Sequence, residues 1–478
     1  MNPFKTVLTL LCLFVITVAN AQHAPKNRVI ILTDIEADAD DTQSLIRLLL
    51  YSNDIDIKGL IATTSVHQKT WIVPESIQKI ISVYNKVLPN LRKHDPAYPD
   101  AQKLSMLVKK GQPGYGLNAT GAGKNSAGSD WIIRELKQND PRPLWISVWG
   151  GANTLAQALY TLKNSNDVAT MKKMVAKLRV YTISDQDDSG IWIRNNFPEL
   201  FYILTPGGYG KATWLAMSKA VDGANNETIS NRWIADNIQQ SKGPLGALYP
   251  DVAYTMEGDT PSWLSLIPNG LNVPNHPEWG GWGGRYELYK PNLADFDAKG
   301  FTGGVPIESE TRPIFTNAAD SYTPVLFNNY GRAVRNDTVS FHDNWATIWR
   351  WRDDYQNDFA ARMDWTTKPY RGANHPPVPA VGHSMAITVT AGEIFSLDAS
   401  GTTDPDGDNL SYLWFQYAET GTLKTPVKIL VAENLYKIFL LAPEVKTTGT
   451  TQFILKVTDK GKPALSRYKR VFLTIKPR

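Results

Sequence analysis

The chain has 478 residues, of which 42% are hydrophobic and 20% are charged, so it can bury more than one sizeable core. This ordinary charge content excludes intrinsic disorder as the main state. The 50 Lys and Arg residues nearly balance the 46 Asp and Glu residues and form no basic block, which argues against nucleic-acid binding. The 15 tryptophans indicate aromatic cores or faces that stack on flat ligands.

The first 21 residues have the pattern of a secretory signal peptide. Lys5 precedes an apolar run from Val7 to Val18, and the small residues Ala19 and Ala21 form a cleavage site. The run is too short for a membrane span, and no later stretch is apolar enough to make one; a buried core helix is the alternative. We expect cleavage after Ala21 and a periplasmic or extracellular protein. Cys12, the only cysteine, leaves with the signal, so the mature chain has no disulfide.

Short apolar runs alternate with helical patterns over residues 22–373, which predicts an α/β domain with a mostly parallel sheet and flanking helices. Strands are expected at 29–32, 57–62, 144–148 and 178–183, and helices at 44–51, 74–88 and 154–162. Aromatic residues recur at helical spacing from Trp345 to Phe359, a stripe that favours core packing over a ligand site.

A stiff Pro-rich linker is expected at residues 374–379, and short alternating runs bounded by turns follow it. They predict an all-β immunoglobulin-like sandwich at 380–478. Asp404, Asp406 and Asp408 either hold Ca²⁺ or, the commoner outcome, make Asx turns. The sandwich is either a sugar-binding module or a structural spacer.

The segment from Asp34 to Asp41 contains five acids in eight positions, directly after the first strand and before a helix. Ligands of open parallel sheets bind at that edge. Like charges this close repel one another, and the loop contains no Lys or Arg, so a divalent cation bound through oxygen atoms is expected. The alternative is a helix cap, which needs one acid.

The pattern Thr33-Asp34-x-x-x-Asp38-x-Asp40-Asp41 resembles the metal loop of the nucleoside hydrolases. Three later segments fall in the same order as in that family: residues 61–67, residues 149–156 and residues 257–259. The chain resembles, more closely, exported bacterial cellulose-binding proteins with a nucleoside hydrolase-like domain. That resemblance rests on residues 33–45, 184–190, 257–284, 349–353 and 359–365 and runs from residue 28 to the C-terminus.

The resemblance implies a site for Ca²⁺ that activates a water for attack on the anomeric carbon of a sugar. Asp34 and Asp41 would be side-chain ligands, Trp149 would give its carbonyl, and Asp259 would complete the site. Asp40 would be the base. Asp38 is the alternative, because this loop is two residues longer than the common family form.

Two positions depart from the nucleoside hydrolase pattern. Gly258 stands where the family has a His that protonates the leaving group, and Glu257 or His276 would have to replace it. His67 stands where an Asn usually holds the sugar. Asn153, in the turn after a later strand, matches the family's turn, and the resemblance implies that it contacts substrate.

A second set of candidate substrate contacts follows from position and residue type. Acids and an amide after the strand at 178–183 could bind sugar hydroxyls, and tryptophans could stack on ring faces. These candidates are Asp185, Gln186, Asp187, Asp188, Trp192, Trp279 and Trp282. The Gly-rich loop around the last two is equally consistent with a folded plug.

Two functions remain open. The first is an exported hydrolase of N-glycosyl or related sugar bonds that uses a Ca²⁺-activated water and an Asp base. The second is a catalytically degenerate protein that binds cellulose or a related carbohydrate.

Overall fold

The structure is a computed structural model that describes residues 25–165, 167–211, 213–292, 294, 304–305, 307–325, 339–431 and 434–478. The expected signal peptide at 1–21 lies outside the described residues. No helix in the described ranges is both long and apolar enough to cross a bilayer.

The first part of the chain is built on an eight-stranded sheet in the order β3-β2-β1-β4-β5-β6-β8-β7, parallel except for β7. This confirms the expected mostly parallel α/β fold. The strands are β1 (Arg28–Thr33), β2 (Asp56–Ala62), β3 (Val108–Lys110), β4 (Leu144–Val148), β5 (Leu178–Thr182), β6 (Phe201–Leu204), β7 (Tyr286–Tyr289) and β8 (Ile314–Asn317). Every residue of the central strands β1 and β4 is buried, as expected for strands covered on both faces.

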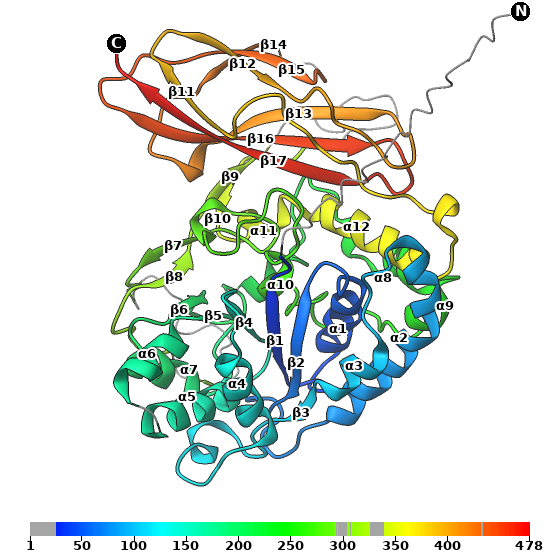
Figure 1. Cartoon of the computed structure of the whole chain (residues 1–478), viewed down its shortest axis with the longest axis vertical. Helices are drawn as coiled ribbons and strands as arrows, with labels where there is room; N and C mark the ends of the chain where they lie inside the picture. Colours follow the sequence, from blue (N-terminus) through cyan, green and yellow to red (C-terminus); the bar gives the residue numbers. More distant parts are fainter. Residues whose placement is uncertain are drawn as a thin grey trace, which may run out of the picture.

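Helices cover both faces of this sheet (Figure 1). They are α1 (Asp40–Leu50), α2 (Pro74–His94), α3 (Ala101–Met106), α4 (Ala127–Lys137), α5 (Asn153–Ser165), α6 (Val168–Val175), α7 (Ser189–Asn196), α8 (Asn231–Ile234), α9 (Gly243–Gly246), α10 (Pro261–Leu264), α11 (Ala346–Trp349) and α12 (Arg352–Trp365). Val29 and Ile31 of β1 face a core with α1, α2 and α12, whereas Ile30 and Leu32 face one with α4, α5 and α7. The alternation follows from the two-residue period of a strand.

Short helical turns and a small hairpin complete this part. The turns are η1 (Gly116–Ala119), η2 (Thr213–Leu215), η3 (Glu227–Ile229), η5 (Pro277–Trp279) and η7 (Tyr370–Gly372), with a π-helical turn η4 (Ala235–Gln239). A further turn, η8 (Ala418–Thr420), lies in the C-terminal part. The hairpin pairs β9 (Asp320–Tyr322) with β10 (Phe341–Asp343). The aromatic stripe from Trp345 to Phe359 is divided between α11 and α12, and most of it is buried, in agreement with the core interpretation.

The C-terminal part is a sandwich of two sheets, as expected from the alternating runs. One sheet has the order β11-β17-β16-β13 and the other β12-β15-β14. The strands are β11 (Ala386–Thr390), β12 (Ile394–Asp398), β13 (Leu410–Tyr417), β14 (Lys428–Val431), β15 (Lys437–Leu441), β16 (Gly449–Asp459) and β17 (Ser466–Lys476). Trp414 is buried between the sheets, so it offers no flat face to a ligand. Asp404 accepts the backbone N–H groups of Asp406 and Asp408, the geometry of an Asx turn. Carboxylate oxygens of these three acids also lie within 4.8 Å of one another, so the Ca²⁺ alternative stays a prediction.

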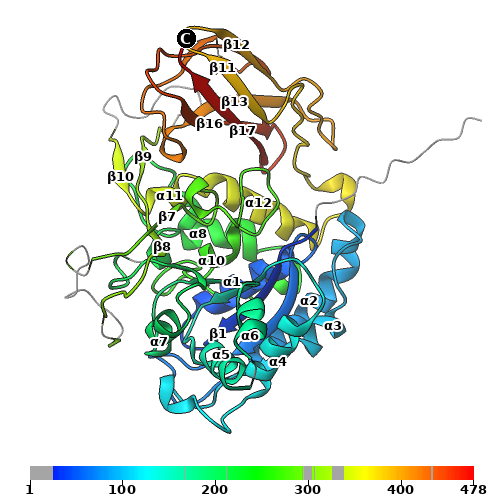
Figure 2. The same ribbon diagram turned by 60° about the vertical axis from the view of Figure 1, so that its left-hand side comes forward.

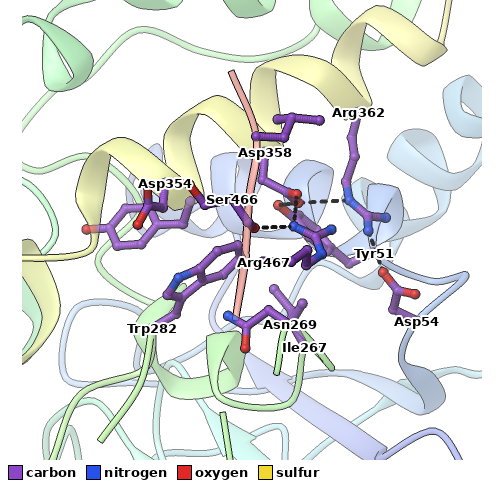
Figure 3. A network of polar contacts seen from close by, with 12 residues as sticks. Tyr51, Asp54, Ile267, Asn269, Trp282, Asp354, Asp358, Arg362, Ser466 and Arg467 are labelled. Atoms are coloured by element: carbon purple, nitrogen blue, oxygen red, sulfur yellow. Dashed lines mark hydrogen bonds and ion pairs between the residues drawn. The ribbon is translucent and has the colours of Figure 1, made fainter. Parts of the chain in front are cut away.

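The sandwich is stacked on one end of the α/β part, with α11 and α12 between them (Figures 1 and 2). Buried polar contacts join the two, as Figure 3 shows around α12. Asp358 pairs with Arg467 at 2.7 Å, and Asp354 pairs with Lys456 at 2.6 Å. Both acids are buried, and an arginine or lysine of the sandwich supplies each of them with a counter-charge. The sandwich is therefore docked on the α/β part and is not a freely tethered module.

Candidate functional site

A cavity of about 410 Å³ is lined by segments that follow the carboxyl ends of β1, β2, β4, β5 and β6. This is the expected ligand edge of a parallel sheet. The lining residues are Asp34, Ala37, Asp38, Asp40, Asp41, His67, Trp149, Gln186, Tyr209, Trp214, Tyr254 and Asp259. All of the predicted metal ligands and both predicted bases are among them.

The acidic loop is shaped by its own hydrogen bonds. The Thr33 hydroxyl donates to Asp41 and accepts the N–H of Ile35 at 3.1 Å, so the loop turns sharply after β1. Asp38 accepts the N–H of Asp40, the first residue of α1, at 2.7 Å. Glu36 points elsewhere, because it accepts the Ser76 hydroxyl of α2. Four of the five loop acids therefore face the cavity.

Oxygen atoms of Asp40, Asp41 and Asp259 lie within 4.8 Å of one another, and all three side chains are buried. We expected Asp34 in this group; Asp40 converges with the other two in its place. The Asp259 Oδ2 atom is buried without a hydrogen-bond partner. This group of three acids therefore has a buried carboxylate oxygen that could still accept a hydrogen bond or bind a cation.

Burial raises the pKa of all four buried carboxyls, and repulsion from neighbouring acids raises it further. The pKa is raised for Asp34 and raised well above its usual value for Asp40, Asp41 and Asp259. For Asp259 the other causes are the charges of Asp40, Asp41 and then Asp34. Among the residues that the structure describes, no Lys or Arg lines this cavity. A bound cation would relieve this repulsion.

Trp149 offers the cavity only its backbone. The indole N–H is turned away and donates to the hydroxyls of Ser147 at 2.8 Å and Ser262 at 3.1 Å. The Trp149 carbonyl accepts a hydrogen bond from the Gln186 amide, which reaches it from the loop after β5. The predicted carbonyl ligand is therefore at the cavity, together with one of the predicted sugar contacts.

An aromatic wall formed by His67, Tyr209 and Trp214 also lines the cavity. His67 Nε2 lies 3.0 Å from the Tyr209 hydroxyl, and the rings of Tyr209 and Trp214 pack at a centroid distance of 5.2 Å. The Trp214 indole donates to Asp40 Oδ2 at 2.9 Å. Burial, and then the charge of Asp34, raises the pKa of the Tyr209 hydroxyl.

Sequence reasoning missed Tyr209, Trp214 and Tyr254. The first two follow β6 within a turn that begins Pro206-Gly207-Gly208, and a Gly-rich turn after a buried strand was the available signal. Tyr254 is 82% exposed at the cavity and lies in a segment with no such signal.

Glu257 was expected to contact substrate, and the structure corrects this. Its side chain is fully buried and pairs with Arg47 of α1 at 2.6 Å. It also accepts hydrogen bonds from the hydroxyls of Tyr249 and Thr260. The Arg47 guanidinium needs a buried counter-charge, which explains the acid at this position. His276, its rival as a replacement acid, stacks on Trp279 outside the cavity lining.

The acids of the second loop also face away from the cavity. Asp185 pairs with Arg194 at 2.7 Å, and Asp188 accepts the N–H of Leu117 at 2.8 Å. Asp187 accepts the N–H groups of Asn153 and Ser189 at the starts of α5 and α7, and burial raises its pKa to about 7. These acids fix loops and helix ends.

Asn153 and three tryptophans likewise have structural contacts where substrate contacts were expected. Asn153 donates to the Gly114 carbonyl at 2.7 Å and is fully buried. Trp192, a residue of α7, packs against the hydrophobic core that this helix covers. Trp279 packs against Phe472 of the sandwich, and Trp282 is fully buried with its N–H directed at Tyr468. The Gly-rich loop is thus the folded plug.

Residues 28–286 match the family model described as cellulose-binding Sde182, nucleoside hydrolase-like domain, and this match covers more than half of the chain. The chain belongs to this family. Residues 394–475 match the model of the C-terminal domain of cellulose-binding protein Sde0182. No curated protein matches the chain.

Among solved structures, the chain is similar to a nucleoside hydrolase-related hypothetical protein from Saccharophagus degradans that is described as associated with carbohydrate metabolism. The identity is 34%, the TM-score is 0.76, and the match covers 95% of this chain and 100% of that one. The PKD domain of the KIAA 1837 protein matches with 23% identity and a TM-score of 0.16, over 21% of this chain and 86% of that one. The effector protein XOO4466 matches with 9% identity and a TM-score of 0.33, over 72% and 95%.

Proposed function

We propose that this chain is an exported hydrolase of glycosidic bonds and that its reaction takes place in the acidic cavity with the help of Ca²⁺. The observation that carries the proposal is the set of converging buried oxygen atoms of Asp40, Asp41 and Asp259 beside an aromatic wall. A family described as nucleoside hydrolase-like supports the reaction class.

The residues at the cavity fit a hard divalent cation. The available donors are carboxylate and carbonyl oxygens, the ligand type that Ca²⁺ prefers, and Asp259 Oδ2 has no other partner. Asp41, Asp259 and the Trp149 carbonyl, with Asp34 beside them, would hold the ion, and Asp40, whose oxygen converges with those of Asp41 and Asp259, would lie next to it as the base. When bound, Ca²⁺ supplies Lewis acidity, which lowers the pKa of a water and orients it.

The chain's own residues would do the rest. Asp40 accepts a proton from the attacking water, and the Trp214 N–H fixes the orientation of its carboxylate. Asp38 is the alternative base; one of its oxygens already accepts the N–H of Asp40. Gln186, His67 and Tyr209 provide polar atoms for sugar hydroxyls. One displacement inverts the configuration at the anomeric carbon.

The second candidate function is binding of cellulose or a related carbohydrate without catalysis. It is favoured by the family's description as cellulose-binding and by Tyr254, whose ring is 82% exposed at the cavity. An exposed aromatic ring beside a polar cavity is suited to stack on a sugar.

A screen of nucleosides and aryl glycosides, with Ca²⁺ present and with it chelated, tests the first function. The expected result is Ca²⁺-dependent release of free sugar that Asp41→Ala abolishes together with Ca²⁺ binding. Asp236→Asn, a change at an exposed acid of η4, is the matched control and keeps both. Ca²⁺ content unaffected by Asp41→Ala would reject the metal site. Retention of an inactive protein on cellulose would favour the second function.

A further inference from the structure

Gly258 lies directly beneath the indole of Trp214. A Cβ atom at position 258 would lie 2.2 Å from both Cδ1 and Nε1 of Trp214 and 2.8 Å from Asp40 Oδ2. These separations are far below van der Waals contact, so no residue with a side chain fits at 258 while the indole stays. The absence of a side chain at 258 is therefore explained by packing against Trp214.

The indole is held in this place from two sides. Its N–H donates to Asp40 Oδ2 at 2.9 Å, and its ring packs against Tyr209 at a centroid distance of 5.2 Å and an interplanar angle of 54°. Tyr209 is in turn in contact with His67 through its hydroxyl. Moving the indole to make room at 258 would break the contact with Asp40.

We propose that Trp214 determines which leaving groups the cavity accepts, because it bars any acidic side chain from position 258 and puts a non-ionising N–H beside Asp40. This inference rests on the proposed hydrolase function. It predicts that the protein prefers glycosides whose leaving group can depart as an anion, because no acid on this side of the cavity supplies that group with a proton.

The bond changes make the preference explicit. The water oxygen bonds to the anomeric carbon, the bond from that carbon to the leaving group breaks, and its electron pair goes to the leaving group. The proton of the water goes to Asp40. A p-nitrophenolate is stable as the resulting anion, whereas hypoxanthine needs a proton, for which general acids contribute about 10²–10⁴-fold.

A thermal-unfolding cycle tests the exclusion without any activity. Gly258→Ala is expected to lower the unfolding midpoint by about 3 °C or more. The loss should be clearly smaller in a Trp214→Ala background, where the clash with the indole is gone and only the close approach to Asp40 Oδ2 remains. Additive effects of the two substitutions would overturn the exclusion of side chains at 258.

The preference is tested with p-nitrophenyl β-ribofuranoside and inosine, which share the sugar and differ in the leaving group. The wild type is expected to prefer the nitrophenyl compound by at least about 100-fold in kcat/KM. The ratio of the two kcat/KM values is then compared in two double variants. It should be at least tenfold smaller in Trp214→Ala/Gly258→His than in Trp214→Ala/Gly258→Ala, which lacks the imidazole. An equal ratio in the two double variants overturns the inference. Hydrolysis of neither substrate by the wild type, when other glycosides are also inert, rejects the proposed function and this preference together.

Discussion

Arg467, on the last strand of the sandwich, lies 2.7 Å from Asp358 of α12, and both side chains are withdrawn from water. Asp358 also accepts the Tyr51 hydroxyl at 2.7 Å and pairs with Arg362 at 3.1 Å. One carboxylate thus links the sandwich, α12 and the residue that directly follows α1 (Figure 3). We therefore expect its charge to stabilise the contact between the sandwich and the α/β part.

Asp358→Asn is expected to destabilise the protein in a pH-dependent way. Although burial opposes ionisation, Arg467 and Arg362 hold the pKa of Asp358 at about 2, below its usual 3.8. A lowered carboxyl pKa stabilises the folded state above the unfolded pKa, and this stability is lost as pH falls toward 2. The difference in unfolding free energy between wild type and variant should shrink by about 2 kcal/mol from pH 5 to pH 2.

Denaturant unfolding at several pH values measures this difference. The exposed Asp236→Asn variant is the control and should track the wild type within about 0.5 kcal/mol at every pH. If the unfolding free energies of the wild type and of Asp358→Asn fall in parallel as the pH is lowered, the stabilising role of the Asp358 charge is contradicted.

Glu257→Gln should destabilise the fold without removing Ca²⁺ binding. The substitution leaves Arg47 buried without a counter-charge, which costs about 3–5 kcal/mol. Arg47→Met/Glu257→Gln should cost less than Glu257→Gln, since no unpaired charge remains. Urea unfolding and Ca²⁺ titration measure the two properties. A stable variant with lost Ca²⁺ binding would instead put Glu257 in the site.

Ca²⁺ binding should release protons and weaken as pH falls. The pKa values of Asp40, Asp41 and Asp259 are raised well above the usual range, so the empty site retains protons that the cation must displace. We expect affinity at pH 5 to be at least about tenfold lower than at pH 8. Calorimetry in buffers of different ionisation enthalpy counts the released protons, and a pH-independent affinity would contradict the prediction.

Tyr254→Ala should weaken sugar binding and leave stability unchanged. The ring is 82% exposed, so its removal should alter the unfolding free energy by less than about 0.5 kcal/mol. Loss of stacking is expected to weaken cello-oligosaccharide binding about threefold to tenfold. Tyr436→Ala, at a 52% exposed ring of the sandwich, is the matched control. Equal losses in both variants would argue against binding at the cavity mouth.

The fold class and the acidic half of the site could be predicted from the sequence. The buried strand Arg28–Thr33 contains the continuous apolar run from Val29 to Leu32, and Asp34 follows where the strand ends. Parallel strands bring their carboxyl ends to one edge, so acids after β1 reach the same cavity as Trp149 after β4. These relations depend only on local pattern and sheet geometry.

The substrate side could not be predicted, because it depends on partners that are far apart in the chain. Glu257 and Asp185 resemble ligand contacts by composition, yet each pairs with a buried arginine. Trp282 resembles a stacking platform, yet the sandwich covers it. Sequence position alone does not show which side of a loop meets water.

The sequence by itself determined that a parallel sheet would gather a set of acids at one edge. The hydrophobic pattern of each strand and the place where the strand ends are local properties of the sequence. The tertiary structure decided which of those acids converge and that Trp214 occupies the space above Gly258. Both depend on how distant segments pack against one another, and packing in a dense interior is fixed only when all neighbours are in place.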